Sequence, residues 1–353
     1  MIIKKIFSPA TSIISLFIIF LFSNISSKSD ENNIKYYSND EGILSIMYHR
    51  FNENKYPSTN IKMDIFKEHI HIIKNSNYNF LNPKNFGEQF NKIKSKKEIL
   101  LTIDDAFESF YTDAWPYLKE NEIPFILFVS TEPVGKRGYM TWKQIKEVES
   151  YNFVIIGHHS HSHEYLIDVS NEEFILDIKK ANRIFFKELG YVPNLFSYPF
   201  GEYSKFMKDY ISINFKYAFG QHSGVIDLNK DKFELPRFPI NEKYGELKRF
   251  KSIINYFPLE YKKILPEEKQ LFKNTNPPEF EVEFFKEQKN LNRINCYSNE
   301  GDIWEKSKTN FSNNSLTIEF REPFKPRRGR INCSLNDNGK WRWFGIQFPI
   351  KEN

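Results

Sequence analysis

The sequence predicts an α/β fold in which a parallel, barrel-like sheet is followed by a small C-terminal β domain. Short apolar runs alternate with amphipathic helical segments over residues 41–258, which is typical of strands buried in a parallel sheet. Several of these runs end in ionisable residues, and parallel folds bind ligands at the carboxyl ends of their strands. After about Pro258, shorter strands with alternating polarity replace this pattern.

Composition places the chain among globular proteins. It has 353 residues, of which 40% are hydrophobic and 27% charged, so it is long enough to bury a sizeable core. The net charge of +5 is spread along the chain without a dense basic stripe. This favours a solvated surface, and no nucleic-acid partner is expected.

The N-terminus predicts export. Lys4 and Lys5 precede an apolar stretch at 13–22, and polar residues follow it. A spanning helix needs about 20 apolar residues, whereas signal-peptide cores have about 7–15. We therefore expect a signal peptide at 1–27 and a linker at 28–40, with the protein periplasmic, secreted or membrane-anchored outside the cytoplasm. Retention of the segment as an anchor, which would attach the protein to a membrane, is the alternative.

The elements of the barrel follow from hydrophobic periodicity. Strands are expected at 43–50, 78–81, 99–103, 124–129, 153–156, 195–198 and 217–219, with a last rim segment at 235–238. Helices are expected at 64–75, 85–93, 111–121, 142–150, 171–189 and 204–213. Asp64 and Thr141 are the predicted N-caps of their helices, and Gly190 is the predicted C-cap of 171–189.

The C-terminal region is predicted to be a separate β domain. We expect a catalytic domain at 41–258, a linker at 259–276 and a β-rich domain at 277–353. Its strands are expected at 280–285, 316–320, 330–335 and 341–348, with Asn338-Gly339 as a hairpin turn. Similar segments at 293–296 and 330–333 are interpreted as paired strands. Three tryptophans are interpreted as the core of this domain, with a sugar-stacking platform as the alternative: Trp304, Trp341 and Trp343.

The two cysteines, Cys296 and Cys333, both belong to this region. In an exported protein an even pair indicates a disulfide. A pair of unbonded core thiols is the alternative.

The candidate chemistry starts at Asp104 and Asp105, which end the strand at 99–103. Adjacent carboxylates repel, so one of them needs a cation or a proton. His159 and His163 stand four residues apart; on a helical turn they would share a face and bind one metal ion. With Asp105 they make the two-histidine, one-carboxylate set of a hydrolytic metal centre, for which Zn²⁺ is expected. An Asp-rich turn and a surface histidine segment are the alternatives without a metal.

Three segments resemble motifs of the polysaccharide deacetylases, carbohydrate esterase family four. They are Thr-Ile-Asp-Asp-Ala at 102–106, His-Ser-His-Ser-His at 159–163 and Phe-Ser-Tyr-Pro-Phe-Gly at 196–201. The resemblance covers about residues 42–240 and implies a distorted (β/α) barrel. The Met-Tyr-His segment at 47–49 resembles the branch with permuted motif order, found in exported poly-N-acetylglucosamine deacetylases.

The resemblance also implies residue roles. Asp104 would be the general base and His49 the general acid, and the backbone N–H of Phe200 would help to hold the oxyanion. The cation, Zn²⁺ or another divalent metal such as Co²⁺, would be bound by three side chains: Asp105, His159 and His163.

Three positions depart from the family pattern. Ser197 stands where the family often has an arginine that orients the base, and we expect Arg237 to supply that charge from another strand. Phe200 stands where the family often has a tyrosine, which changes nothing if that residue contributes only its backbone N–H. Ala106 replaces a glycine, which matters if the turn needs a positive φ. His158, beside a predicted ligand, is expected to support the site or to be exposed.

The predicted function is that of an exported, metal-dependent hydrolase of carbon–nitrogen bonds other than peptide bonds. It would remove N-acetyl groups from an N-acetylated polysaccharide or oligosaccharide containing N-acetylhexosamine. The alternatives are a non-catalytic cell-envelope glycan-binding protein with a degenerate barrel, and an O-deacetylase of xylan-like esters.

Overall fold

The computed structural model describes residues 41–92, 97–286, 288, 290–325 and 327–351. The expected signal peptide and the linker at 28–40 lie outside the described residues. Among the described helices, none is both long and apolar enough to cross a membrane.

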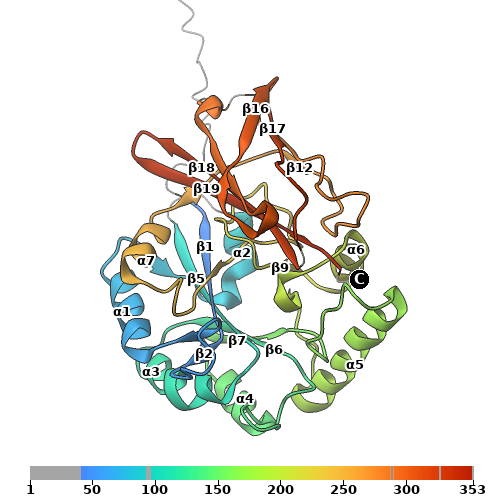
Figure 1. Ribbon diagram of the computed structural model, residues 1–353. Coiled ribbons are helices and arrows are strands. Elements are labelled where there is room, and N and C mark those ends of the chain that lie inside the picture. The colour runs from blue at the N-terminus through green and yellow to red at the C-terminus, as the bar shows by residue number, and fades with distance from the viewer. Residues whose placement is uncertain (1–40, 93–96, 287, 289, 326, 352–353) are drawn as a thin grey trace, which may run out of the picture. The chain divides into compact units, whose positions relative to one another are not determined.

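The central sheet consists of parallel strands in the order β10-β1-β5-β6-β7-β8-β9, with β4 paired to β5. Its strands are β1 Ile43–Tyr48, β4 Asn79–Phe80, β5 Glu98–Asp104, β6 Phe125–Val129, β7 Val154–His158, β8 Leu195–Ser197, β9 Tyr217–Phe219 and β10 Phe238–Pro239. The sheet curls into an incomplete barrel (Figure 1). The predicted distorted parallel barrel is thereby confirmed.

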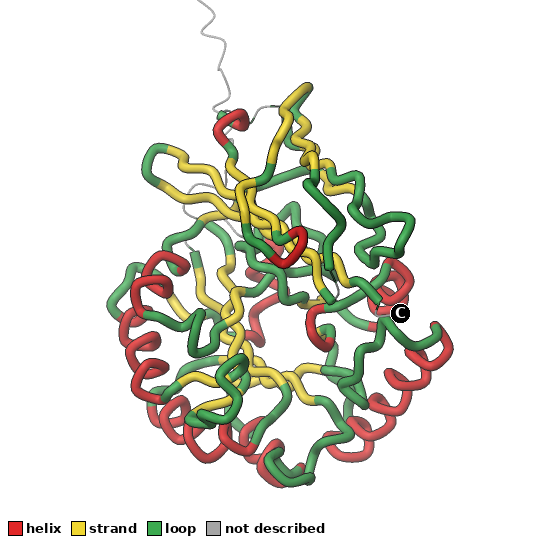
Figure 2. The backbone as a smooth tube through the Cα atoms, in the orientation of Figure 1, coloured by secondary structure: helices red, strands yellow, loops and turns green. Residues whose placement is uncertain are grey.

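Helices surround the outside of the curled sheet (Figure 2). They are α1 Met63–Lys74, α2 Phe86–Asn91, α3 Trp115–Glu120, α4 Trp142–Glu149, α5 Asn171–Leu189, α6 Lys205–Asn214 and α7 Leu247–Ile253. Short 3-10 turns lie at η1 Pro83–Asn85, η3 Pro199–Gly201, η4 Leu291–Arg293 and η5 Glu300–Asp302, and a π-turn at η2 Phe110–Ala114 precedes α3. The predicted helix at 111–121 is therefore a π-turn followed by a shorter α-helix.

The ends of two helices follow local sequence signals. Thr141 caps α4 in a capping box, and Gly190 ends α5 at a φ of 83°, as predicted. The prediction for Asp64 is wrong, because α1 begins one residue earlier and Lys62 is its N-cap residue. The N–H of Met63 donates instead to Asn52 Oδ1 at 2.9 Å, a tertiary contact that periodicity does not reveal.

Two antiparallel-rich sheets follow the barrel in sequence. One has the order β11-β19-β18-β14-β15 and the other β12-β13-β17-β16. Their strands are β11 Phe257–Pro258, β12 Lys263–Leu265, β13 Glu281–Glu283, β14 Asn295–Ser298, β15 Glu305–Lys306, β16 Lys308–Ser312, β17 Ser315–Glu319, β18 Arg328–Asp337 and β19 Lys340–Pro349. A two-stranded ribbon, β2 Arg50–Phe51 with β3 Asn60–Ile61, follows β1. Strand β12 lies inside the stretch expected to be a linker, and the domain boundaries stay a prediction.

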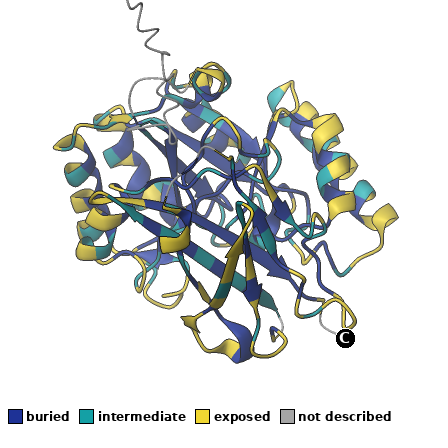
Figure 3. Cartoon of the chain, turned by 90° about the horizontal axis from the view of Figure 1, so that it is seen from above, coloured by how far each residue is buried: buried dark blue, intermediate teal, exposed yellow. Residues whose placement is uncertain are grey.

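The C-terminal sheets share a hydrophobic core of their own, and Figure 3 shows buried strands at the centre with exposed outer helix faces. Cys296 on β14 lies opposite Cys333 on β18, and the two form a disulfide. This confirms the predicted bond and the predicted pairing of the two similar segments. The β18–β19 hairpin turns at Asn338-Gly339, as expected, and both residues have positive φ.

The interpretation of the tryptophans as domain core is wrong. Trp304 and Trp341 are each 45% exposed, and Trp343 stacks on Tyr256 at a centroid distance of 5.0 Å. Along β19, the alternation of side chains gives the core position to Phe344 and directs Trp343 to the opposite face.

Candidate active site

A buried ion pair lies at the carboxyl end of β5. Both oxygens of Asp104 accept hydrogen bonds from Arg237, at 2.7 and 2.9 Å, and both residues are fully buried. Arg237 also donates to Ser197 Oγ at 2.8 Å and to the Gly220 carbonyl at 2.9 Å. The guanidinium thus comes from the segment before β10 and contacts both Asp104 and the serine that replaces the expected arginine.

This pair sets the charge of Asp104. Burial, the largest single influence, opposes ionisation of the carboxyl group, but the neighbouring positive charges, of which Arg237 contributes most, together outweigh burial and lower the pKa of Asp104. The carboxylate is therefore ionised at neutral pH and held in one orientation by a bidentate contact.

Next to this pair, three predicted metal ligands converge. One ligand atom each from Asp105, His159 and His163 lies within 4.8 Å of the other two. Asp105 Oδ1 is 3.0 Å from His163 Nε2 and 3.4 Å from His159 Nε2. The histidines come from the loop after β7 and the aspartate from the turn after β5, so the parallel sheet brings together residues more than fifty positions apart.

The hydrogen bonding of these side chains fits a divalent cation. His159 Nδ1 donates to the Ser197 carbonyl at 2.7 Å, which leaves the lone pair of a neutral imidazole on Nε2. Neither His159 Nε2 nor Asp105 Oδ1 has a hydrogen-bond partner among the described residues, although both atoms are buried. A lone pair that faces a carboxylate repels it, and a cation between them removes that repulsion.

The electrostatics of His163 agree with this assignment. Burial, the largest single influence, disfavours its imidazolium form, but the Asp105 and Asp104 carboxylates together outweigh burial and raise the pKa of His163. For Asp105, burial is likewise outweighed by the histidines, and its pKa is held well below the ordinary value. The site therefore favours positive charge beside Asp105.

Left-handed backbone conformations shape the turns of the site. Asp105 has a φ of 74° and Ala106 a φ of 52°, and the same region is adopted by Ser160, His163 and Phe200. Such conformations cost about 1–2 kcal/mol for a residue with a Cβ atom. The turn after Asp105 therefore does need a positive φ, and Ala106 bears a strain that a glycine would avoid.

His49 and Phe200 line the same cavity as Asp105 and His163. Burial lowers the pKa of His49, against the opposing charges of the two aspartates. The Phe200 ring stacks on Tyr165 at 4.1 Å and meets His163 edge-on at 4.7 Å. The two residues are thus placed at the predicted site, and their catalytic roles stay predictions.

Two other histidines of the segment lie outside the ligand cluster. His161 Nδ1 is 2.8 Å from Thr131 Oγ1. His158 is buried, and its Nδ1 accepts from the Ser160 N–H at 3.1 Å, which supports the turn before the ligands. Burial lowers the pKa of His158 to about 3. It is surrounded by aromatic rings: Phe185, Phe196 and Phe215.

Sequence reasoning did not find the contribution of β18 and β19 to this cavity. Gln347 donates to the carbonyls of Phe200 and Gly201 at 3.1 and 3.3 Å, and Arg330 and Trp343 also line the cavity. The local sequence of these strands does not indicate that they line the cavity. Trp343, which lies on the face of β19 opposite the C-terminal core, is consistent with a second contact surface.

Comparison with known proteins supports the motif assignment. The family model described as polysaccharide deacetylase matches residues 91–218. A putative polysaccharide deacetylase, YxkH of Bacillus subtilis, is 24% identical over 45% of this chain, and the match spans only 57% of its own length. A poly-β-1,6-N-acetyl-D-glucosamine N-deacetylase of Staphylococcus aureus (strain N315) is 22% identical over 62% of this chain and 86% of its own.

Solved structures share the barrel. The Streptococcus pyogenes deacetylase PplD, in complex with acetate, has a TM-score of 0.52 at 24% identity and covers 57% of this chain and 93% of its own. IcaB from Ammonifex degensii has a TM-score of 0.54 at 22% identity, with 60% and 97% covered. These likenesses show the fold, and with the family match they confirm the family resemblance predicted from the motifs.

Proposed function

We propose that this chain, which contains a polysaccharide deacetylase domain, is an exported, metal-dependent N-deacetylase of glycans that contain N-acetylglucosamine or a related N-acetylhexosamine. The convergence of Asp105, His159 and His163 beside the buried Asp104–Arg237 pair carries this proposal. The activity printed in the name of the staphylococcal relative supports the choice of N-acetylglucosamine polymers.

Each side chain has a task in amide hydrolysis. Held by Asp105, His159 and His163, a divalent cation such as Zn²⁺ or Co²⁺ would supply Lewis acidity toward the amide carbonyl and toward water. Asp104, ionised and oriented by Arg237, accepts the proton of the attacking water. The Phe200 N–H stabilises the oxyanion.

His49 completes the reaction. It donates a proton to the nitrogen of the breaking C–N bond, so that acetate and a free amine leave. Its position on the same cavity as Asp105 supports this role. A neutral amine leaving group needs such a proton, because an amide anion is a very poor leaving group.

Two features support export. The N-terminal segment has the length and charge of a signal peptide, and the Cys296–Cys333 disulfide suits an oxidising compartment. The partner would be an N-acetylated polysaccharide outside the cytoplasm. If the N-terminal segment is retained, it would also attach the protein to a membrane.

The test is acetate release by the purified protein from N-acetylglucosamine oligomers. We expect release that is abolished by a chelator and restored by Zn²⁺ or Co²⁺. Release from acetylated xylan alone would replace the proposal with an O-deacetylase. Absence of release from both substrates, with zinc bound, would favour a glycan-binding protein.

A further inference from the structure

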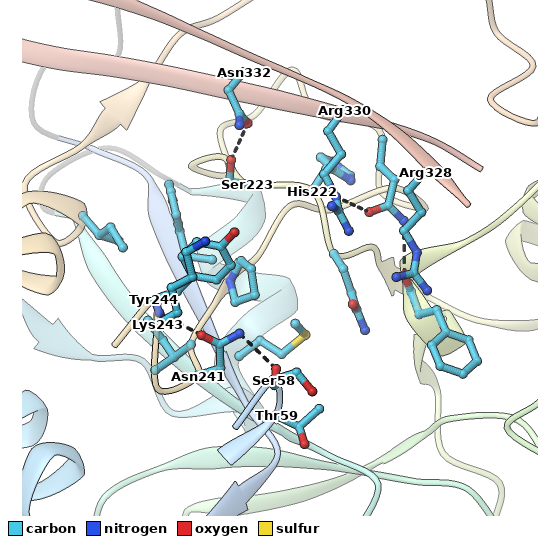
Figure 4. Close-up of a pocket in the computed structure, with 18 of the residues that line it drawn as sticks. Ser58, Thr59, His222, Ser223, Asn241, Lys243, Tyr244, Arg328, Arg330 and Asn332 are labelled. Atoms are coloured by element: carbon cyan, nitrogen blue, oxygen red, sulfur yellow. Dashed lines mark hydrogen bonds between the residues drawn. The ribbon is translucent and has the colours of Figure 1, made fainter. Parts of the chain in front are cut away.

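The cavity above the ligand cluster has two walls of different origin. Its volume is about 740 Å³. Asp105, His163 and Phe200 line it from turns at the barrel end. Arg328 and Arg330 of β18 extend into it from the C-terminal hairpin (Figure 4). A glycan that fills this cavity would contact the C-terminal hairpin as well as the barrel.

The hairpin is fixed to the barrel by direct contacts. Ser223 donates to Asn332 Oδ1 at 2.8 Å and accepts from Trp343 Nε1 at 2.8 Å. At Gly345, a Cβ atom would lie 2.7 Å from the Ser223 carbonyl, so only glycine allows this approach. These contacts hold the hairpin in a fixed position against the barrel.

The charged lining of the cavity is mainly cationic and comes from both walls: Arg328 and Arg330 lie on β18, Arg249 lies on α7, and Lys243 lies in the loop before α7. Four of the cavity's lining residues carry positive charge: Lys243, Arg249, Arg328 and Arg330. Asp105 is the one acidic residue among the described lining residues, and it belongs to the ligand cluster.

Three of these cations have no carboxylate partner. Arg328 is paired with Glu202 at 2.6 Å. For Lys243, Arg249 and Arg330, the described part of the chain offers no carboxylate within salt-bridge distance. Arg330 makes one long side-chain contact, 3.5 Å to Gln347 Oε1, and Arg249 lies over the Tyr244 ring at 5.0 Å.

Arg249 and Arg330 are partly buried, whereas Lys243 is exposed. A partly buried cation without a counter-charge is costly, and a bound anion would offset that cost. Burial and the neighbouring Arg328 charge both lower the pKa of Arg330, which reflects the same unfavourable concentration of positive charge. A guanidinium binds carboxylate and phosphate oxygens through paired N–H groups.

We propose that Arg330, in the cavity that Lys243 and Arg249 also line, binds an anionic group, a carboxylate or a phosphate, on the glycan that is deacetylated. The preferred substrate is then an acidic glycan instead of a neutral N-acetylglucosamine homopolymer. This inference rests on the proposed function, since it places the acetamido group at the ligand cluster and the anion against the hairpin.

The test compares three oligosaccharides of equal length with the zinc-loaded full-length protein. One is a neutral N-acetylglucosamine oligomer, the second alternates N-acetylglucosamine with glucuronic acid, and the third carries 6-phosphate groups. Dissociation constants from calorimetry and kcat/KM for acetate release are measured at low and high salt. We expect at least tenfold tighter binding of one acidic oligomer, and this preference should shrink as salt increases.

The variant Arg330→Gln should reduce the preference for the acidic oligomer about tenfold. Arg293→Gln, which removes an exposed cation of the C-terminal region that does not line the cavity, should leave the preference unchanged. The two acidic oligomers distinguish carboxylate from phosphate as the recognised group.

Equal affinity for neutral and acidic oligomers, or an unchanged preference in Arg330→Gln, would overturn the inference. Binding is read separately from turnover. Tight binding of an acidic oligomer without acetate release would therefore refute the deacetylase function while it supports the anion site.

Discussion

The reacting end of the barrel and the C-terminal hairpin face one cavity, and their charged groups differ in how far they are already paired. On the barrel side, Asp104 and Arg237 are fully buried and satisfy each other. On the hairpin side, Arg330 is half-buried with one long contact, and Trp304 on the same cavity is 45% exposed.

This difference separates chemistry from recognition. A reacting centre works best when its charges are fixed before the substrate arrives, since reorganisation then adds little to the barrier. A recognition wall gains affinity by leaving its groups unsatisfied until the ligand binds. Changes on the barrel side should therefore affect kcat and stability, and changes on the hairpin side should affect substrate preference.

The largest effect is expected from the ligand cluster. Asp105→Ala or His163→Ala should lower acetate release by about a thousandfold or more, because the cation and its Lewis acidity are lost together. Zinc content per chain, measured by elemental analysis, should fall in parallel. His161→Ala is the matched control, since this histidine of the same segment contacts Thr131 instead. Full zinc content in the Asp105 variant would refute the ligand assignment.

The second effect tests the ion pair that distinguishes the barrel side. Arg237→Gln leaves the Asp104 carboxylate buried without a counter-charge, so unfolding free energy should fall by about 3–5 kcal/mol. The pKa of Asp104 should rise, because the Arg237 charge that lowers it is gone, and the acid limb of the rate profile should move to higher pH. Denaturant titration and a pH–rate profile measure the two effects, and an unmoved acid limb would exclude Asp104 as the group titrating there.

The same contrast explains what sequence could predict. Asp104, Asp105, His159 and His163 were predictable because strand, turn and ligand signals lie within short segments. Arg237 was predictable because a missing arginine at Ser197 leaves a buried carboxylate that needs a charge. The hairpin wall could not be predicted, because the surface that Arg330 faces depends on packing between sheets that are distant in sequence.

The disulfide tests whether the hairpin is stabilised independently of the chemistry. It joins residues 37 positions apart, so Cys333→Ala combined with Cys296→Ala should cost about 3–4 kcal/mol of unfolding free energy. Below the unfolding transition, zinc content should be unchanged, because no barrel ligand contacts the bond. Loss of zinc in the folded double variant would show that the two walls are coupled.

A buried histidine on α1, His69, gives a smaller, pH-dependent effect on the free energy of unfolding. His69 donates to the Gly245 carbonyl at 2.7 Å and lies 3.0 Å from the Tyr48 hydroxyl, and burial lowers its pKa to about 4. Between pH 6.5 and 4, His69 is protonated in the unfolded chain but not in the folded chain. Its contribution to the free energy of unfolding is therefore complete above pH 6.5 and is lost as the pH falls. The loss is at most roughly 3 kcal/mol.

Denaturant titrations from pH 7 to 4 measure this contribution. His69→Gln should flatten the fall in stability, while His71→Gln, on the exposed face of the same helix, should keep it. Identical slopes in both variants would assign the acid sensitivity to other groups.

The smallest effect concerns the hairpin turn. Asn338 has a φ of 51°, a conformation that asparagine tolerates better than alanine, so Asn338→Ala should cost about 1 kcal/mol. Asn338→Gly should cost little, because glycine adopts this region freely. The turn lies at the opposite end of the hairpin from the pair Arg330 and Gln347, so both variants should keep the wild-type substrate preference. A changed preference in Asn338→Ala would mean that the recognition wall depends on the stability of the whole hairpin and not on the local contacts that fix it to the barrel.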